Sequence, residues 1–93
     1  MIEAERYTLA RFEPLVGSGF TLRLDDATGL PARLIDTRAG SDPSFSITFE
    51  APLEPALPQR IYRLEHPQLD AMDLFLVPVA RTATGLHYEA VFG

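Results

Sequence analysis

Strict alternation of apolar and polar side chains marks two segments of the chain, residues 20–25 and 45–50. In the second segment Phe45, Ile47 and Phe49 are each followed by a polar residue. Successive side chains of a β-strand point to opposite faces, so this pattern predicts a strand with one buried face in each segment.

Three further segments show the same period less regularly. Residues 60–66 and 86–92 alternate and predict two more strands. Residues 30–37 begin with alternation and lose phase at Ile35, which predicts a strand with a β-bulge or a second buried face.

A sixth strand is predicted at residues 73–81, where apolar side chains occupy both faces, as in a strand covered on both sides. Pro78 lies within it and cannot donate to a β-ladder, so a bulge or an edge position is expected there. The one helical candidate is residues 8–13, with Thr8 as a potential cap and Pro14 as the stop. Leu9, Phe12 and Val16 share its apolar side.

Residues rich in Gly, Pro, Asp and Ser separate these segments, and the proline-rich stretch at residues 52–58 reads as a stiff loop within one domain. The predicted fold is therefore all-β and mainly antiparallel, a small six-stranded sandwich or barrel with one short N-terminal helix. Residues 1–93 are expected to form a single β domain.

Composition narrows the possible functions. The 93 residues include no cysteine, which excludes disulfides, thiolate metal sites and a thiol nucleophile. The net charge is −5, with 13 acidic and 8 basic residues, so nucleic acid is not an expected partner. All the basic residues are arginine, which suits recognition of carboxylates or phosphates. A GC-rich genome gives the same bias and is the favoured explanation, with the functional one left open.

The chain offers no segment for membrane insertion. Its longest apolar run, residues 74–80, is far shorter than the roughly 20 residues that a spanning helix needs. The first residues are acidic and mixed where a secretory signal needs a basic start followed by an apolar stretch. A cytoplasmic location on synthesis is expected, which is compatible with later incorporation into an extracellular or phage-like particle.

Two histidines are the only side chains that titrate near neutral pH in the absence of cysteine. His66 ends a predicted strand on the face of Tyr62, where a partly buried ring bonded to the backbone is the simplest expectation. His87 falls on the polar face with Glu89 and is expected to be solvated. Because the two rings point to different environments, no metal site is expected.

Other catalytic patterns are also missing. Ser18 has a glycine on each side, but not the spacing of a nucleophile elbow, and reads as a turn. The pairs Asp25 with Asp26 and Asp70 with Asp73 fall in predicted turns. We therefore expect no catalytic residue, no metal and no cofactor.

A candidate interaction or ligand surface is nevertheless present, because tyrosine and arginine are favoured in protein interfaces. A tyrosine in a thin β domain can equally be a core residue with its hydroxyl at the rim. The candidate residues are Arg60, Tyr62, Arg63, Glu65 and His66.

The chain resembles a family of short bacterial proteins of unknown function in the order of four segments, residues 45–49, 59–67, 74–79 and 88–92, and of the earlier Phe12, Leu15, Gly17 and Phe20. Members of that family resemble neighbours of phage-tail-collar or tail-fibre-like proteins. The resemblance implies a role in building or decorating an extracellular or phage-derived structure, and it implies no catalytic residues.

Three hypotheses follow. The first is a non-catalytic protein-binding or assembly module that docks a protein partner or copies of itself through an exposed sheet edge or an Arg/Tyr patch. The second is a small β-barrel enzyme or ligand-binding protein with His66, Tyr62 and Glu65 near its mouth. The third is an acidic inhibitor or immunity-type protein.

Overall fold

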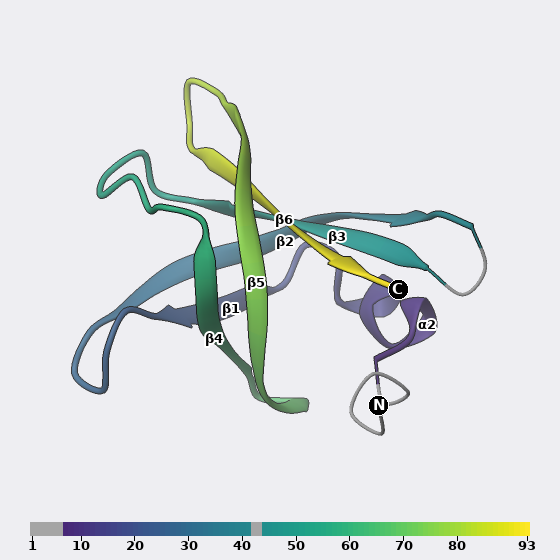
Figure 1. Ribbon diagram of the computed structural model, residues 1–93. Helices are drawn as coiled ribbons and strands as arrows, with labels where there is room; N and C mark the ends of the chain where they lie inside the picture. Colours follow the sequence, from purple (N-terminus) through teal and green to yellow (C-terminus); the bar gives the residue numbers. More distant parts are fainter. Residues whose placement is uncertain (1–6, 42–43) are drawn as a thin grey trace.

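The computed structural model describes residues 7–41 and 44–93, which form two short helical turns and six strands (Figure 1). In chain order these are α2 (Leu9–Phe12), the 3₁₀ helix η1 (Glu13–Leu15), β1 (Gly19–Arg23), β2 (Gly29–Ala39), β3 (Phe45–Ala51), β4 (Arg60–His66), β5 (Leu69–Arg81) and β6 (Leu86–Phe92).

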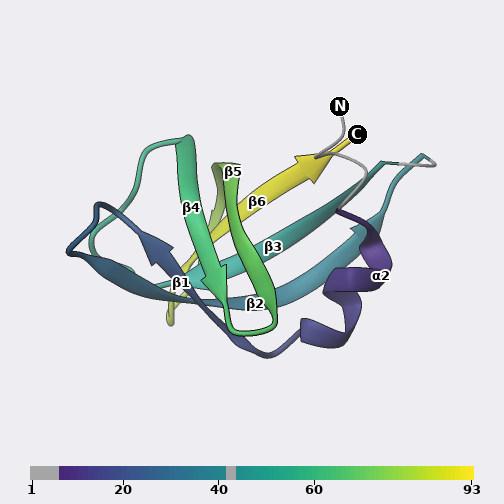
Figure 2. The ribbon, with the colours of Figure 1, turned by 90° about the horizontal axis from the view of Figure 1, so that it is seen from below.

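The six strands close into a barrel in the order β1-β2-β3-β6-β5-β4, with every neighbouring pair antiparallel. Every strand has a hydrogen-bonded neighbour on each side, and Figure 2 shows the barrel from below. The predicted all-β, mainly antiparallel fold with one short N-terminal helix is confirmed, in its barrel form.

Most expected strand features are found. The strands β4 and β6 have the bounds that alternation predicts. Beyond Leu34 the register of β2 against β3 shifts at the position where the pattern loses phase, so the expected bulge at Ile35 is confirmed. A second shift, between Pro78 and Ala80, places the proline of β5 at a bulge.

The prediction for β5 is wrong in two respects. The strand begins at Leu69, four residues earlier than expected, and it is not covered on both sides. Leu74 and Leu76 are buried, whereas Phe75 keeps 52% of its surface exposed. The outer surface of a barrel has no second layer over it in the described chain, so the apolar side chains that point outward stay in contact with solvent.

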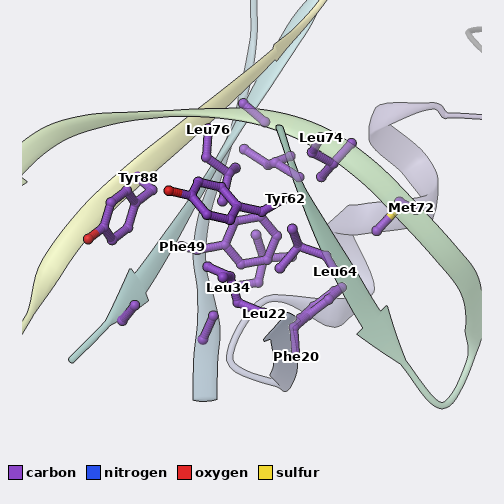
Figure 3. Close-up of a cluster of buried hydrophobic side chains, with 14 of the residues drawn as sticks. Phe20, Leu22, Leu34, Phe49, Tyr62, Leu64, Met72, Leu74, Leu76 and Tyr88 are labelled. Atoms are coloured by element: carbon purple, nitrogen blue, oxygen red, sulfur yellow. The ribbon is translucent and has the colours of Figure 1, made fainter. Parts of the chain in front are cut away.

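Inward-facing side chains of all six strands fill the barrel (Figure 3). Leu22, Leu34, Phe49 and Leu64 have no exposed surface. A barrel of this size leaves room inside only for its own side chains.

One end of the barrel is closed by the proline-rich loop. Tyr62 and Tyr88 point their hydroxyls to the same side, away from Met72 (Figure 3). The Tyr88 hydroxyl accepts a hydrogen bond from the Leu57 amide at 3.1 Å, and the Tyr62 hydroxyl donates to the Pro58 carbonyl at 2.6 Å. These two bonds hold the loop across the barrel end.

The other end is covered by α2 and η1. The Phe12 ring lies 6.0 Å from that of Phe45 and 5.6 Å from that of Phe92. Leu15 is buried, and Val16, expected on the inner face, is 44% exposed. The chain tightens into a 3₁₀ turn after Phe12, which changes the rotation per residue and brings Leu15 inward instead.

The helix start also differs from the expectation. Thr8 is the N-terminal cap residue, but its side chain makes no capping hydrogen bond. Neither helix in the part of the chain that the structure describes has the length and apolar character needed to cross a membrane.

Candidate functional site

His66 lies between the β4–β5 hairpin and the turn that leads into β1. Its Nδ1 accepts a hydrogen bond from the Gln68 amide at 3.0 Å, and its Nε2 lies 3.1 Å from Ser18 Oγ. The ring also packs on Phe20, with 4.6 Å between the ring centroids. These contacts make His66 a half-buried link between two distant segments.

The hydrogen bonds also fix the direction of proton donation. A backbone amide can only donate, so Nδ1 of His66 is an acceptor and the neutral ring carries its proton on Nε2. Nε2 therefore donates to Ser18 Oγ, whose own proton goes to the Leu15 carbonyl at 2.6 Å. A serine nucleophile needs a histidine that accepts its proton, and here the bond runs in the opposite direction.

The structure places Tyr62 in the core, 4% exposed, with its ring under the guanidinium of Arg60 at 5.4 Å from the ring centroid. Burial raises the pKa of the Tyr62 phenol, and the nearby charge of Arg60 opposes that rise. Tyr62 therefore belongs to the barrel end with Pro58 and not to a tyrosine-rich outer surface.

Arg63 and Glu65 point outward from β4. Glu65 accepts a hydrogen bond from Arg23 Nε at 3.0 Å, and Asp73 accepts one from Arg63 Nε at 3.3 Å. Arg23 and Arg63 are direct cross-strand partners, a like-charge pair that is unfavourable without these carboxylates. The five candidate residues thus divide between the interior and the outer face, and they do not form one surface.

An outer-face polar cluster was missed by the sequence analysis. His87, expected to be solvated, is bonded through Nε2 to Glu50 Oε2 at 3.1 Å. Glu50 also accepts hydrogen bonds from Arg33 and Thr84. The bond to His87 is the main cause that lowers the pKa of Glu50, with Arg33 and Thr84 adding to it and burial opposing it.

Gly85 makes this arrangement possible. A Cβ at position 85 would lie 2.6 Å from Glu50 Cγ and 2.7 Å from the Ala51 carbonyl oxygen, both closer than real contacts allow. The only signal in the sequence is that Glu50 and His87 face the same side of two strands, and it becomes visible only once β3 and β6 are known to pair.

The outer face of β4 and β5 carries a second feature, which we call the Ile61–Phe75 patch and define as Ile61, Phe75 and Val77. Ile61 and Phe75 are direct cross-strand partners, 64% and 52% exposed, and half-buried Val77 follows on the same side of β5. Figure 1 shows β4 and β5 side by side on one wall of the barrel. The sequence did not reveal this patch, because the apolar run around Phe75 hid the direction of that side chain.

No metal centre emerges from these residues. Within residues 7–41 and 44–93, no group of three or more histidine, aspartate or glutamate side chains is placed to hold a metal ion. The chemistry that this part of the chain offers is hydrogen bonding, ion pairing and apolar contact.

A family model described as a domain of unknown function, DUF6916, matches residues 7–92. The match extends from just before the helical turns to the last residue of β6, so it covers the whole barrel. Comparisons with curated proteins and with solved structures gave no match.

Proposed function

We propose that this chain, which belongs to the DUF6916 family of unknown function, is a non-catalytic protein-binding or assembly module that docks through the Ile61–Phe75 patch. The observation that carries the proposal is the exposure of two large apolar side chains, Ile61 and Phe75, directly opposite each other on neighbouring strands. An apolar cluster rimmed by polar residues is typical of protein interfaces.

Charged residues surround the Ile61–Phe75 patch. Arg63 and Asp73 form an ion pair two residues along β4 and β5 from Ile61 and Phe75, on the same face. On the other side, Val77 has Glu89 of β6 as its cross-strand partner. An apolar centre between charged neighbours can exclude water when a partner covers it.

The outer face is a better docking surface than a strand edge or the interior of the barrel. Each strand has a hydrogen-bonded neighbour on both sides, which argues against recognition by simple addition of a strand to a long open edge. Side chains fill the barrel, and the ends are covered by α2 on one side and the proline-rich loop on the other. A partner therefore meets the outer surface.

The geometry of His66 supports the non-catalytic part of the proposal. Both ring nitrogens are engaged, with Gln68 and with Ser18, in a direction that leaves Ser18 without a base. These contacts support a structural role for His66 rather than a role in catalysis or in ligand binding at a barrel mouth.

A phage-tail-like or extracellular fibre assembly is one setting that suits a small docking module of this kind. That setting is the one that the sequence resemblance implies.

The test is recovery of partner proteins by a tagged chain from cells that produce it. The Ile61→Ser/Phe75→Ser variant should lose a partner that the wild type retains, because truncation of an interface hot spot costs at least about 2 kcal/mol of binding energy. Val16→Ser is the matched control, an exposed valine at the N-terminal turn. Equal recovery by all three proteins would overturn the proposal.

A further inference from the structure

The charges around the Ile61–Phe75 patch indicate what kind of partner it receives. Beside the patch, the outer surface between β1 and β4 forms an open hollow of about 400 Å³. It is lined by Arg23, Leu24, Asp25, Asp26, Arg63 and Glu65.

The positive charges of this hollow are already matched inside the chain. Arg23 is paired with Glu65 at 3.0 Å and Arg63 with Asp73 at 3.3 Å. The hollow therefore offers no uncompensated guanidinium to an anionic partner.

Its other two carboxylates, Asp25 and Asp26, form no ion pair with these arginines, although the charge of Arg23 adds to the lowering of the Asp25 pKa. Asp25 accepts hydrogen bonds from the amides of Ala27 and Thr28, both at 2.8 Å, which mainly account for the lowering of its pKa and keep it ionised. Asp26 lies next to it in the same turn, and Glu89 stands at the opposite side of the patch beside Val77. Carboxylates thus lie on both sides of the patch, and the basic residue beside it, Arg60, rests over the Tyr62 ring at the barrel end.

A second copy of this chain is a poor complement to such a surface. Each copy has a net charge of −5, and a face-to-face pair would bring two acidic rims together. Like-charge juxtaposition at an interface is unfavourable and selects against the wrong partner.

We infer that the partner presents an apolar centre surrounded by arginine or lysine side chains, which would meet Ile61 and Phe75 at the centre and Asp25, Asp26 and Glu89 at the rim. This inference rests on the proposed function and names the chemistry of the partner at the same surface. Opposite charges at the rim would speed association and give it a strong dependence on salt.

Two synthetic peptides of equal length test the inference, one alternating leucine with lysine and the other leucine with glutamate. Their binding to the ¹⁵N,¹³C-labelled chain is followed by NMR at the Ile61 methyl and the Phe75 amide. We expect the lysine peptide to bind at these positions at least about tenfold more tightly than the glutamate peptide. Its affinity should fall several-fold as ionic strength rises from about 0.01 M to about 0.15 M, where the Debye length shortens from about 30 Å to about 8 Å.

Matched variants separate the charge from the apolar centre. Asp26→Asn/Glu89→Gln should weaken binding of the lysine peptide several-fold, while Glu54→Gln, in the proline-rich loop, should leave it unchanged. Ile61→Ser/Phe75→Ser, which lacks the Ile61 methyl, should abolish the shift of the backbone amide at position 75, and Val16→Ser should preserve the shifts at both positions.

The outcomes distinguish the two proposals. Equal binding of both peptides at Ile61 and Phe75 overturns the inference about charge and keeps the docking surface. A concentration-dependent dimer in sedimentation, strengthened by salt and lost in Ile61→Ser/Phe75→Ser, overturns it in favour of a second copy. If neither peptide shifts Ile61 or Phe75 and no dimer forms, the proposed function itself fails.

Discussion

Ser18 and His66 lie 48 residues apart in the chain and are joined by a hydrogen bond of 3.1 Å. The bond connects the turn after η1 to the end of β4, so it holds the N-terminal helical cap on the barrel. His66 was the candidate residue of the enzyme or ligand-binding hypothesis, and this bond gives it a structural role instead.

Replacement of Ser18 by alanine tests this link. Ser18→Ala removes the acceptor of His66 Nε2 and the donor to Leu15, and we expect a loss of about 1 kcal/mol in the free energy of unfolding. Urea denaturation followed by circular dichroism measures it. Ser46→Ala, on the outer face of β3, is the control, and an equal loss in both variants would contradict a specific role for Ser18.

The limits of sequence reasoning are clear at this link. The span of β4 was predictable because Arg60 to His66 alternate between two faces and a turn follows. The Ser18 contact was not, since it exists only when β1 pairs with β4 and the barrel closes. The alternation of apolar and polar residues predicts where strands lie along the chain. It does not predict the order of the strands in the barrel, and contacts between β1 and β4 depend on that order.

The outward direction of Phe75 shows a second limit. In residues 74–80 both faces are apolar, so periodicity could not separate a strand buried on both sides from one with an exposed apolar face. Composition also could not show that the ion pairs of Arg23 and Arg63 leave a negative rim, because each pairing depends on cross-strand register.

Gly17 provides a test of the same junction through its backbone. Its φ is +94°, a conformation that residues with a Cβ rarely adopt, while its amide donates to the Leu34 carbonyl at 2.7 Å. Gly17→Ala should therefore destabilise the fold by about 1 kcal/mol or more.

Gly19→Ala is the matched control for this glycine. The backbone at position 19 has no positive φ, and a Cβ added there would meet no atom within 4 Å, so alanine should be tolerated. Similar unfolding midpoints for the two variants would contradict the proposed backbone constraint.

The Tyr88 hydroxyl is expected to matter for stability. Tyr88→Phe leaves the buried Leu57 amide without its acceptor, and an unsatisfied buried donor costs about 1–3 kcal/mol. Thermal and urea unfolding measure the loss. If Tyr88→Phe were as stable as the wild type, the loop would not depend on this bond.

Glu50 should give stability a pH dependence in the acid range. Its pKa is lowered from 4.5 in the folded state, chiefly by the hydrogen bond to His87. The carboxylate therefore contributes stability that is fully present above pH 4.5 and is lost as pH falls through the lower folded value.

The variant Glu50→Gln removes this titration. Its stability, measured by urea unfolding at a series of pH values, should fall less steeply than that of the wild type below pH 4.5. Parallel pH profiles for the two proteins would show that Glu50 does not contribute in this way.

The central claim is that the Ile61–Phe75 patch is where another protein docks. Site-specific photo-crosslinking tests it most directly, with p-benzoylphenylalanine placed at position 75 in one protein and at position 16 in another, both produced in cells that contain the natural partners. We expect a discrete adduct of this chain with one other protein from position 75, and none from position 16. The absence of a discrete adduct at position 75, or the same products from both positions, would contradict the claim.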